Sequence, residues 1–278
     1  MAGKPQAAVP YGTEPEVGRP YLSVIVPCYN ERENLLRGVL EEMSAYLRRQ
    51  SYPCEVLICD DGSTDDSREI ARQRIVHMPG FLLLENAHGG KPSAVWHGIQ
   101  AAQAELILFT DMDQSTPLDQ LGKLLPLLCG GYDVAIGSRG MDRENFPLYR
   151  RLGSSAFRGF RRAFLLRSIS DTQCGFKAMR AAVARELFPQ LEAIQRPARL
   201  TGWKVTAFDV ELLFLAERAG YRIGEVSVDW ADRDTARGKG KSYLAESREM
   251  ATQVLRVRLN AWRGVYGPAR SEGSDECP

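Results

Sequence analysis

The chain lacks the segments that define several large classes of protein. No run approaches the roughly 18 to 20 consecutive apolar residues that a membrane-spanning helix needs. The N-terminus shows no charged-then-apolar signal-peptide pattern. The glycine- and lysine-containing P-loop pattern is absent, and G-x-G-x-x-G does not follow the first apolar run, so P-loop and dinucleotide-binding proteins are disfavoured. We therefore expect a protein that is soluble or peripheral to a membrane.

Cysteine, histidine and net charge are also low. The 6 cysteines form no C-x-x-C pair and no zinc-finger spacing, and the 3 histidines are not spaced as metal ligands. A reduced, cytoplasmic environment is expected, in which free cysteine acts as a small apolar residue. The net charge of +1 gives the whole molecule no attraction to polyanions, so any basic function must come from local clusters.

Strand-like and helix-like segments alternate along the first half of the chain. Continuous apolar runs predict strands, and apolar residues at helical spacing or a proline at a helix start predict helices. The expected strands are 22–27, 55–59, 81–85, 106–110 and 133–137, and the expected helices are 31–50, 92–103, 117–128 and one that starts at 63–66. This alternation predicts an α/β fold with a mostly parallel sheet and helices on both faces.

Both ends of the chain differ in composition from the middle. Residues 1–20 contain 4 prolines and predict a disordered leader. Residues 246–266 predict a C-terminal amphipathic helix, and 267–278 predict a polar tail. The main domain is therefore expected over residues 21–245.

Two aspartates flank one residue at the end of an apolar run, in Asp111-Met112-Asp113. In an extended segment residues i and i+2 point the same way, so both carboxylates can converge on one divalent cation. Mg²⁺ and Mn²⁺ prefer such oxygen ligands and keep other positions for phosphate or water. The alternative is an ordinary pair of surface acids.

Other polar motifs fall at the ends of the expected strands. Tyr29 to Glu31 follow the first strand, and Asp60-Asp61-Gly62 follow the second, where a carboxylate can accept hydrogen bonds from a nucleotide or cap the next helix. Gly89-Gly90-Lys91 precede a helix and predict either an anion site or an ordinary loop. Ligands of parallel sheets bind beyond the carboxyl ends of the strands, so the coincidence of these motifs indicates a binding site.

Basic residues gather in the second half of the chain. The stretch 147–167 holds 6 arginines, no acid and interleaved apolar residues, which suits either an anionic membrane surface or a core-packing helix with a solvated arginine face. A stripe in the stretch 244–266 is expected to face the core: it consists of Leu255, Leu259, Trp262 and Tyr266. A loop with a cluster of cations predicts a phosphate clamp or a solvated charge run: Arg233, Arg237, Lys239 and Lys241.

Two acidic motifs remain open in meaning. Asp171 precedes a glycine turn and is either a general base or a turn residue. Asp209 and Glu211 open an expected helix over 209–219, where they can be partners of the helix dipole.

In this order, the motifs resemble those of family 2 glycosyltransferases, in particular the dolichyl-phosphate β-glucosyltransferase and dolichol-phosphate mannose synthase group. The motifs that carry the resemblance are Val26-Pro27-Cys28-Tyr29-Asn30-Glu31, Asp60-Asp61-Gly62-Ser63-Thr64-Asp65, Gly90-Lys91, Asp111-Met112-Asp113, Gly137-Ser138-Arg139 and Asp171-Thr172-Gln173-Cys174-Gly175-Phe176-Lys177. The resemblance covers roughly residues 21–245. It implies the GT-A fold, a Rossmann-like mostly parallel sheet.

The resemblance also implies residue roles. The nucleotide-sugar would contact Pro27, Tyr29, Glu31, Asp60, Asp61, Lys91, Asp111 and Met112. Asp111 and Asp113 would hold Mg²⁺ or Mn²⁺ on the diphosphate. Asp171 and Arg139 are the expected catalytic residues, with Arg139 facing phosphate and Asp171 near the acceptor. Met112 and Gln114 stand where the family usually has Ala and often Leu or Gly.

The expected reaction transfers a hexose from a nucleoside-diphosphate sugar with inversion. A phosphate monoester acceptor is largely dianionic near pH 7 and needs cations, whereas a hydroxyl acceptor needs a general base. The many cations favour a polyprenyl phosphate acceptor, met at the periphery of the inner face of a membrane, with the acceptor phosphate on Arg150, Arg151, Arg233 and Lys241. The alternatives are a soluble hydroxyl acceptor, such as a glycan or secondary metabolite, and a non-catalytic binding module. Nucleic acid is disfavoured because acids at the strand ends would repel it.

Overall fold

The computed structural model describes residues 19–139, 169–196, 208–233, 252 and 255–266. Within these residues, seven strands form one sheet in the order β3-β2-β1-β4-β6-β5-β7. Their bounds are β1 Leu22–Cys28, β2 Cys54–Asp60, β3 Phe81–Glu85, β4 Leu106–Phe109, β5 Val134–Ser138, β6 Lys177–Arg180 and β7 Ile223–Ser227. Among these seven described strands, only β6 runs antiparallel to its neighbours, β4 and β5. The predicted mostly parallel α/β sheet is confirmed.

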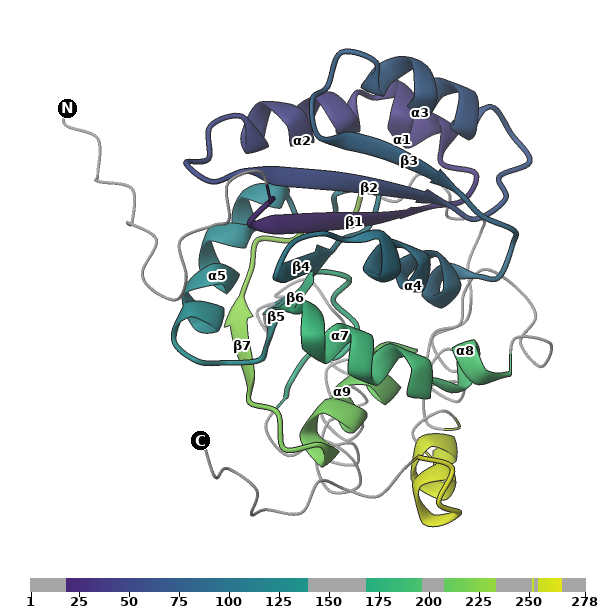
Figure 1. Ribbon diagram of the computed structural model, residues 1–278, viewed down its shortest axis with the longest axis vertical. Coiled ribbons are helices and arrows are strands. Elements are labelled where there is room, and N and C mark those ends of the chain that lie inside the picture. Colours follow the sequence, from purple (N-terminus) through teal and green to yellow (C-terminus); the bar gives the residue numbers. More distant parts are fainter. Residues whose placement is uncertain (1–18, 140–168, 197–207, 234–251, 253–254, 267–278) are drawn as a thin grey trace, which may run out of the picture.

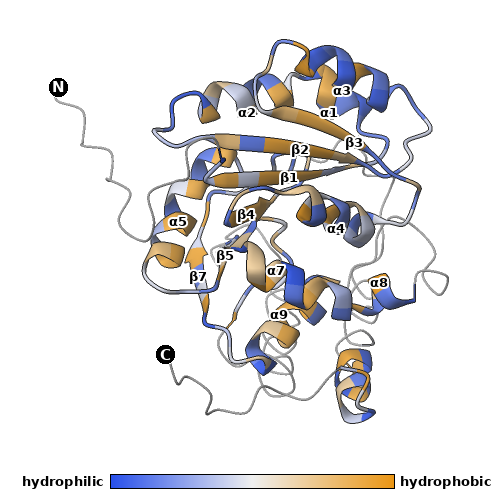
Figure 2. Cartoon of the chain, in the orientation of Figure 1, coloured by the Kyte–Doolittle hydropathy of each residue, from blue (hydrophilic) through white to orange (hydrophobic). Residues whose placement is uncertain are grey.

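Helices cover both faces of the sheet (Figure 1). One face packs against α1 Arg32–Leu36, α2 Val39–Leu47, α3 Ser67–Ile75 and α5 Leu121–Cys129. The other face packs against α4 Lys91–Ala101, α7 Ala181–Leu187 and α9 Phe208–Arg218. Short turns of helix lie at η1 Leu118–Gln120, η2 Phe188–Gln190 and α8 Glu192–Gln195. Residues 255–262 form the C-terminal helix. Strands buried on both sides need continuous apolar runs, and the strands are accordingly among the most hydrophobic parts of the chain (Figure 2).

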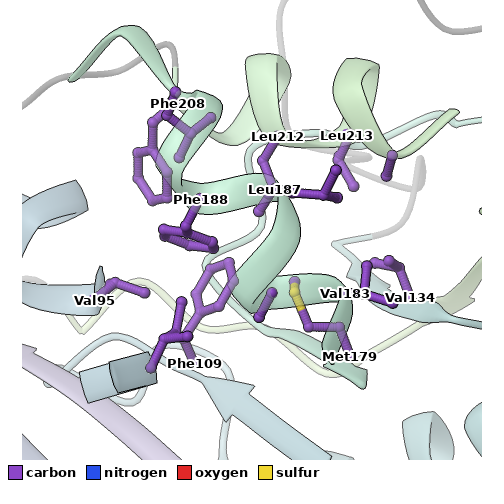
Figure 3. Packing of buried hydrophobic residues seen from close by; sticks show 14 of the residues in the cluster. Val95, Phe109, Val134, Met179, Val183, Leu187, Phe188, Phe208, Leu212 and Leu213 are labelled. Atoms are coloured by element: carbon purple, nitrogen blue, oxygen red, sulfur yellow. The ribbon is translucent and has the colours of Figure 1, made fainter. Parts of the chain in front are cut away.

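Alternate residues of each central strand enter different cores. Ile25 and Leu57 pack with α4, whereas Val24 and Val56 pack with the helices of the opposite face. The α4 side is deepened by three rings from β4, η2 and α9: Phe109, Phe188 and Phe208 have centroids 6.3 to 6.5 Å apart (Figure 3). Phe109 is the last residue of β4, so this aromatic cluster packs against the end of that strand on the α4 side of the sheet.

At Gly98, helix α4 approaches the sheet with no side chain of its own between them. A Cβ atom at Gly98 would lie 2.5 Å from Cγ2 of Ile25 and 2.8 Å from Sγ of Cys59. Glycine at this position therefore sets how closely α4 approaches β1 and β2.

Two sequence expectations about helices were wrong. The single helix expected over 31–50 is divided into α1 and α2, because Gly38 has a left-handed φ of +90° that interrupts the helix. The stripe expected to face the core does not do so: Leu255, Leu259 and Trp262 are exposed, and Val257, Asn260 and Tyr266 are buried instead. Periodicity identified an apolar face, but polar contacts on the other side of the helix decide its orientation.

The limits expected for the domain, leader and tail stay predictions, because residues 1–18 and 267–278 lie outside the described residues. The arginine-rich stretch 147–167 also lies outside them. Within the part of the chain that the structure describes, no helix has both the length and the apolar character needed to cross a bilayer.

Candidate active site

The predicted motifs meet at one edge of the sheet, because β1, β2 and β4 are parallel neighbours. Cys28 at the end of β1 pairs in register with Asp60 at the end of β2, and Ile25 pairs with Phe109 at the end of β4. The residues after these strands therefore leave the sheet on the same side. The sequence expectation that these motifs share one edge is confirmed.

Asp111 and Asp113 follow β4 in a tight turn rather than in an extended strand. Gln114 has a left-handed φ of +51°, and its side-chain amide donates to the carbonyl oxygen of Asp111 at 2.8 Å. Oδ1 of Asp113 accepts from the backbone N–H of Ser115 at 2.8 Å. Met112 is 1% exposed and packs into the core, so any contact that it makes with a ligand would come from its main chain.

Both aspartates line a cavity of about 120 Å³. The walls come from four segments that are distant in sequence. They consist of Asp111, Asp113, Ser115, Arg139, Gln173, Cys174, Gly175, Trp230 and Asp232. The structure therefore brings the predicted metal ligands and the predicted Arg139 into one pocket. Trp230 and Asp232 were not found from the sequence, and Gln173 lies in a motif that carried the family resemblance but was given no role.

The segment after β7 lies across the turn that carries Asp113. Its Ala231 N–H donates to the carbonyl oxygen of Ser115 at 2.8 Å. The guanidinium of Arg37, just beyond α1, donates to the carbonyl oxygen of Asp113 at 2.6 Å and to that of Arg233 at 3.2 Å. Arg37 therefore joins two walls of the pocket through their main chains, a role with no signal in the sequence.

Arg139 and Asp171 form a two-point ion pair at the pocket wall. Nε and Nη2 of Arg139 lie 2.7 and 2.9 Å from the two carboxylate oxygens of Asp171. Burial alone would raise the pKa of Asp171, but the charge and hydrogen bonds of Arg139 outweigh it and lower that pKa to about 2. The guanidinium also lies 5.8 Å from the ring centroid of Trp230. Asp171 thus holds the orientation of Arg139 and is a weak base at neutral pH.

Lys91, the first residue of α4, points to the same turn. Its Nζ lies 2.5 Å from Oδ1 of Asp111. Burial lowers the pKa of Lys91, but the carboxylates of Asp111 and Asp209 raise it above its ordinary value, so the side chain stays charged. The fully buried Lys177 of β6 lies 2.5 Å from Asp209. Acidic and basic side chains therefore alternate in the order Lys177, Asp209, Lys91 and Asp111, which lines the pocket.

Asp60 and Asp61 are both fully buried with protein partners. Asp60 accepts two hydrogen bonds from Arg68 at 3.0 and 2.7 Å. Asp61 accepts from the N–H groups of Gly89 and Gly90 at 2.9 and 2.8 Å, which fixes the loop before Lys91. Burial raises the pKa of Asp61, although these N–H groups and His88 act in the opposite direction. Their predicted contacts with a nucleotide stay predictions.

An aromatic contact follows the end of β1. The ring of Tyr29 lies 4.6 Å from that of His88, centroid to centroid, and Nδ1 of His88 lies 2.8 Å from Oδ2 of Asp61. Pro27 is buried in β1, and Glu31 accepts a hydrogen bond from Asn34 at 2.6 Å. His88 was missed because no motif or spacing in the sequence links it to Tyr29.

The predicted acceptor residues are only partly described. Nη1 of Arg233 lies 3.3 Å from Oε2 of Glu42 on α2. Arg150, Arg151 and Lys241 lie outside the described residues, as do Arg237 and Lys239, so their roles stay predictions.

Comparison with known proteins shows the family of the chain. Residues 23–188 match the family model described as glycosyl transferase family 2. The chain belongs to glycosyl transferase family 2. It is therefore an enzyme, a glycosyltransferase, as its motifs predicted.

Curated relatives match this glycosyltransferase over most of its length. It is 30% identical over 265 residues to the dolichyl-phosphate beta-glucosyltransferase of Dictyostelium discoideum, covering 88% of this chain and 76% of that one. It is 34% identical over 264 residues to the protein of the same name from Drosophila melanogaster, covering 87% and 77%. The predicted resemblance to this group is confirmed.

Solved structures show the fold of the glycosyltransferase. Mannosyl-3-phosphoglycerate synthase from Rubrobacter xylanophilus matches with a TM-score of 0.60 at 17% identity, covering 91% of this chain and 78% of that one. The mannosyltransferase PcManGT from Pyrobaculum calidifontis, solved with GDP-Man and Mn²⁺, matches with a TM-score of 0.57 at 21% identity, covering 94% and 69%. These matches confirm the predicted GT-A fold.

The carboxylate oxygens in the pocket of the glycosyltransferase are suitable ligands for a divalent cation. Asp111 and Asp113 place two hard oxygen donors in one pocket. Within residues 19–139, 169–196, 208–233, 252 and 255–266, no cluster of three or more His, Cys, Asp or Glu side chains is arranged to hold a metal. A cation would thus take two carboxylates from the protein and complete its coordination with phosphate or water.

Proposed function

We propose that this glycosyltransferase moves a hexose from a nucleoside-diphosphate sugar to a polyprenyl phosphate, with inversion and with Mg²⁺ or Mn²⁺. The donor side rests on the pocket that unites Asp111, Asp113 and Arg139. The hexose and the lipid phosphate are supported by relatives named dolichyl-phosphate beta-glucosyltransferase. Solved neighbours that hold UDP or GDP-Man with Mn²⁺ support the nucleotide and the cation.

The ion pair and the lowered pKa of Asp171 are the observations that favour a phosphate over a hydroxyl acceptor. A hydroxyl acceptor needs a general base, whereas a phosphate monoester is largely dianionic near pH 7 and attacks without one. Asp171 is paired at two points with Arg139, and its pKa is lowered to about 2 by that pair despite its burial. The residue that could have served as base therefore acts to orient a cation, which suits a phosphate acceptor.

The proposed step is a single displacement. A phosphate oxygen of the acceptor bonds to the anomeric carbon from the face opposite the leaving group. The bond from that carbon to the diphosphate oxygen breaks, and the electron pair stays on the diphosphate. Arg139 and Lys91 are the described cations placed to stabilise negative charge at the pocket. A cation held by Asp111 and Asp113 would offset charge on the leaving diphosphate.

A transfer assay tests this proposal. Purified enzyme is given UDP- or GDP-hexoses, Mn²⁺ or Mg²⁺, and either a short-chain polyprenyl phosphate or the matching polyprenol. We expect product only with the phosphate, with inverted anomeric configuration, and a loss of about 10²- to 10³-fold in kcat for Asp113→Asn. The matched control is Asp119→Asn, at an exposed acid in η1.

The outcomes separate the alternatives. Transfer to polyprenol or to a soluble glycan would replace the phosphate acceptor with a hydroxyl one. Binding of the donor without transfer to any acceptor would instead support a non-catalytic binding module. Full activity of Asp113→Asn in the presence of a chelator would contradict the metal role.

A further inference from the structure

One face of the C-terminal helix presents apolar and basic side chains to solvent. Leu255, Leu259 and Trp262 are 49%, 46% and 81% exposed. Arg258 and Arg263 are also exposed. Positions spaced by three, four, seven and eight residues share one side of a helix, so these five side chains form one surface. We call it the Trp262 face.

The opposite side of the helix is held by polar contacts, which fix the Trp262 face outward. Arg256 pairs with Glu192 of α8 at 2.6 Å, and Asn260 donates to the same carboxylate at 3.2 Å. Tyr266, just after the helix, donates to the buried Glu211 of α9 at 2.7 Å. These contacts tie the helix to α8 and α9, so its exposed apolar side chains are not the result of detachment. Figure 1 shows the helix below α8.

The chemistry of the Trp262 face matches a bilayer interface. Tryptophan is enriched where headgroups meet hydrocarbon, and leucine at helical spacing supplies the buried stripe of an interfacial helix. Residues 255–266 contain 3 arginines and no acid. Since Arg256 is paired with Glu192, Arg258 and Arg263 are the exposed cations that flank the apolar residues. Such cations attract anionic lipid.

A second copy of the chain is a poorer occupant for this surface. Leu255, Leu259 and Trp262 together offer only a few hundred Å² of apolar area, because even a fully buried tryptophan covers about 250 Å². A stable protein interface needs about 800 Å² from each partner. Two copies would also bring Arg258 and Arg263 toward their own counterparts, which like charges oppose.

We propose that the Trp262 face docks the enzyme on the surface of an anionic membrane. This inference deepens the proposed function and rests on it for the reason to dock, since a polyprenyl phosphate acceptor resides in a bilayer. Because the helix is held to α8 and α9, its docking would fix the orientation of the catalytic domain relative to the membrane.

Vesicle flotation of the full chain tests the proposal. The vesicles are either phosphatidylcholine alone or an equal mixture of phosphatidylcholine and phosphatidylglycerol. We expect the parent protein to float with the mixed vesicles only. Trp262→Glu should reduce binding about tenfold or more, and Arg258→Glu with Arg263→Glu should reduce it similarly. Val76→Glu is the matched control, because Val76 is an exposed apolar residue, at 68%, beyond α3.

Two further measurements separate docking from folding and from transfer. Circular dichroism should show an unchanged fold for Trp262→Glu, and its transfer to a water-soluble short-chain acceptor should equal that of the parent, because this residue is outside the pocket. Transfer to long-chain acceptor in mixed vesicles should fall with flotation. If the parent fails to float, or Trp262→Glu floats equally well, docking by this face is wrong even where soluble transfer persists.

A change in oligomeric state supplies the remaining outcome. Sedimentation should give the same species for the parent and Trp262→Glu. A dimer that Trp262→Glu converts to monomer, with vesicle binding unaffected, would assign the face to a second copy and overturn the proposal. Vesicle binding without any transfer to polyprenyl phosphate would instead contradict the proposed function and leave the docking surface standing.

Discussion

A Cβ atom at position 175 would lie 2.1 Å from Oδ2 of Asp111, so Gly175 and Asp111 are packed against one another without room for a side chain. Gly175 follows the Asp171 turn and Asp111 follows β4, and both line the same pocket. The position of the first aspartate thus depends on a glycine that is remote in sequence.

Gly175→Ala should therefore displace the Asp111 carboxylate while leaving the fold intact. We expect a loss of activity of about tenfold or more and a higher Mn²⁺ requirement, because a displaced ligand weakens the positioning of the diphosphate. The measurement is initial rate against Mn²⁺ concentration. Gly122→Ala, in α5 with nothing near its Cβ position, is the control and should leave the rate unchanged. Equal rates for the two variants would contradict the steric argument.

The pair of Asp171 with Arg139 predicts a pH-dependent contribution to stability. The folded pKa of about 2 lies below the ordinary value of 3.8, so the contribution is fully present above about pH 4 and is lost as the pH falls toward 2. At neutral pH it amounts to about 2 kcal/mol. Urea unfolding of the parent and Asp171→Asn should therefore differ by less at about pH 3 than at about pH 5. A constant difference would show that the carboxylate is not the titrating group.

The buried pair of Lys177 and Asp209 predicts strong coupling between two substitutions. Lys177→Met leaves the carboxylate of Asp209 without its partner in the interior and should destabilise the protein by about 3–5 kcal/mol. Adding Asp209→Leu removes that unpaired charge, so the double variant should recover part of the loss. Urea titrations of the two single variants and the double variant measure this coupling, and additive losses would argue against it.

Arg37 predicts an effect on the pocket without an effect on the fold. Arg37→Gln removes the guanidinium that joins the carbonyl groups of Asp113 and Arg233. Because the side chain is exposed, stability should change by less than about 0.5 kcal/mol. We expect a several-fold higher KM for the donor with a smaller change in kcat. Arg49→Gln, at an exposed arginine after α2, is the control. An unchanged KM would mean that the two walls hold together without Arg37.

The first half of the fold was predictable because its strands are continuous apolar runs ended by polar motifs. β6 and β7 were not predicted. β6 is a four-residue strand that carries the charge of Lys177, and this charge is buried because tertiary contacts with Asp209 and the carbonyl oxygen of Cys174 pair it. The break at Gly38 was also missed, because an apolar stripe continues through α1 and α2 and gives no sign of a left-handed residue.

The site was predictable to the extent that its residues follow strands. Asp111, Asp113, Lys91 and Arg139 carry recognisable motifs, and they do gather at the sheet edge. Trp230, His88 and Arg37 have no such signal, because they reach the site through tertiary contacts. For the same reason the sequence identified the apolar stripe of the C-terminal helix but misjudged which way it points.

The direct contact of α4 with the sheet at Gly98 has a consequence for how donor preference could evolve. Lys91 and the glycine loop bound to Asp61 stand at the start of this helix, so the depth at which α4 seats against Ile25 and Cys59 sets their distance from Asp111. A larger residue at position 98 would act as a spacer beneath the helix and shift these groups together. Variants with altered affinity for nucleotide sugars can therefore arise at sheet-facing positions that never touch the ligand.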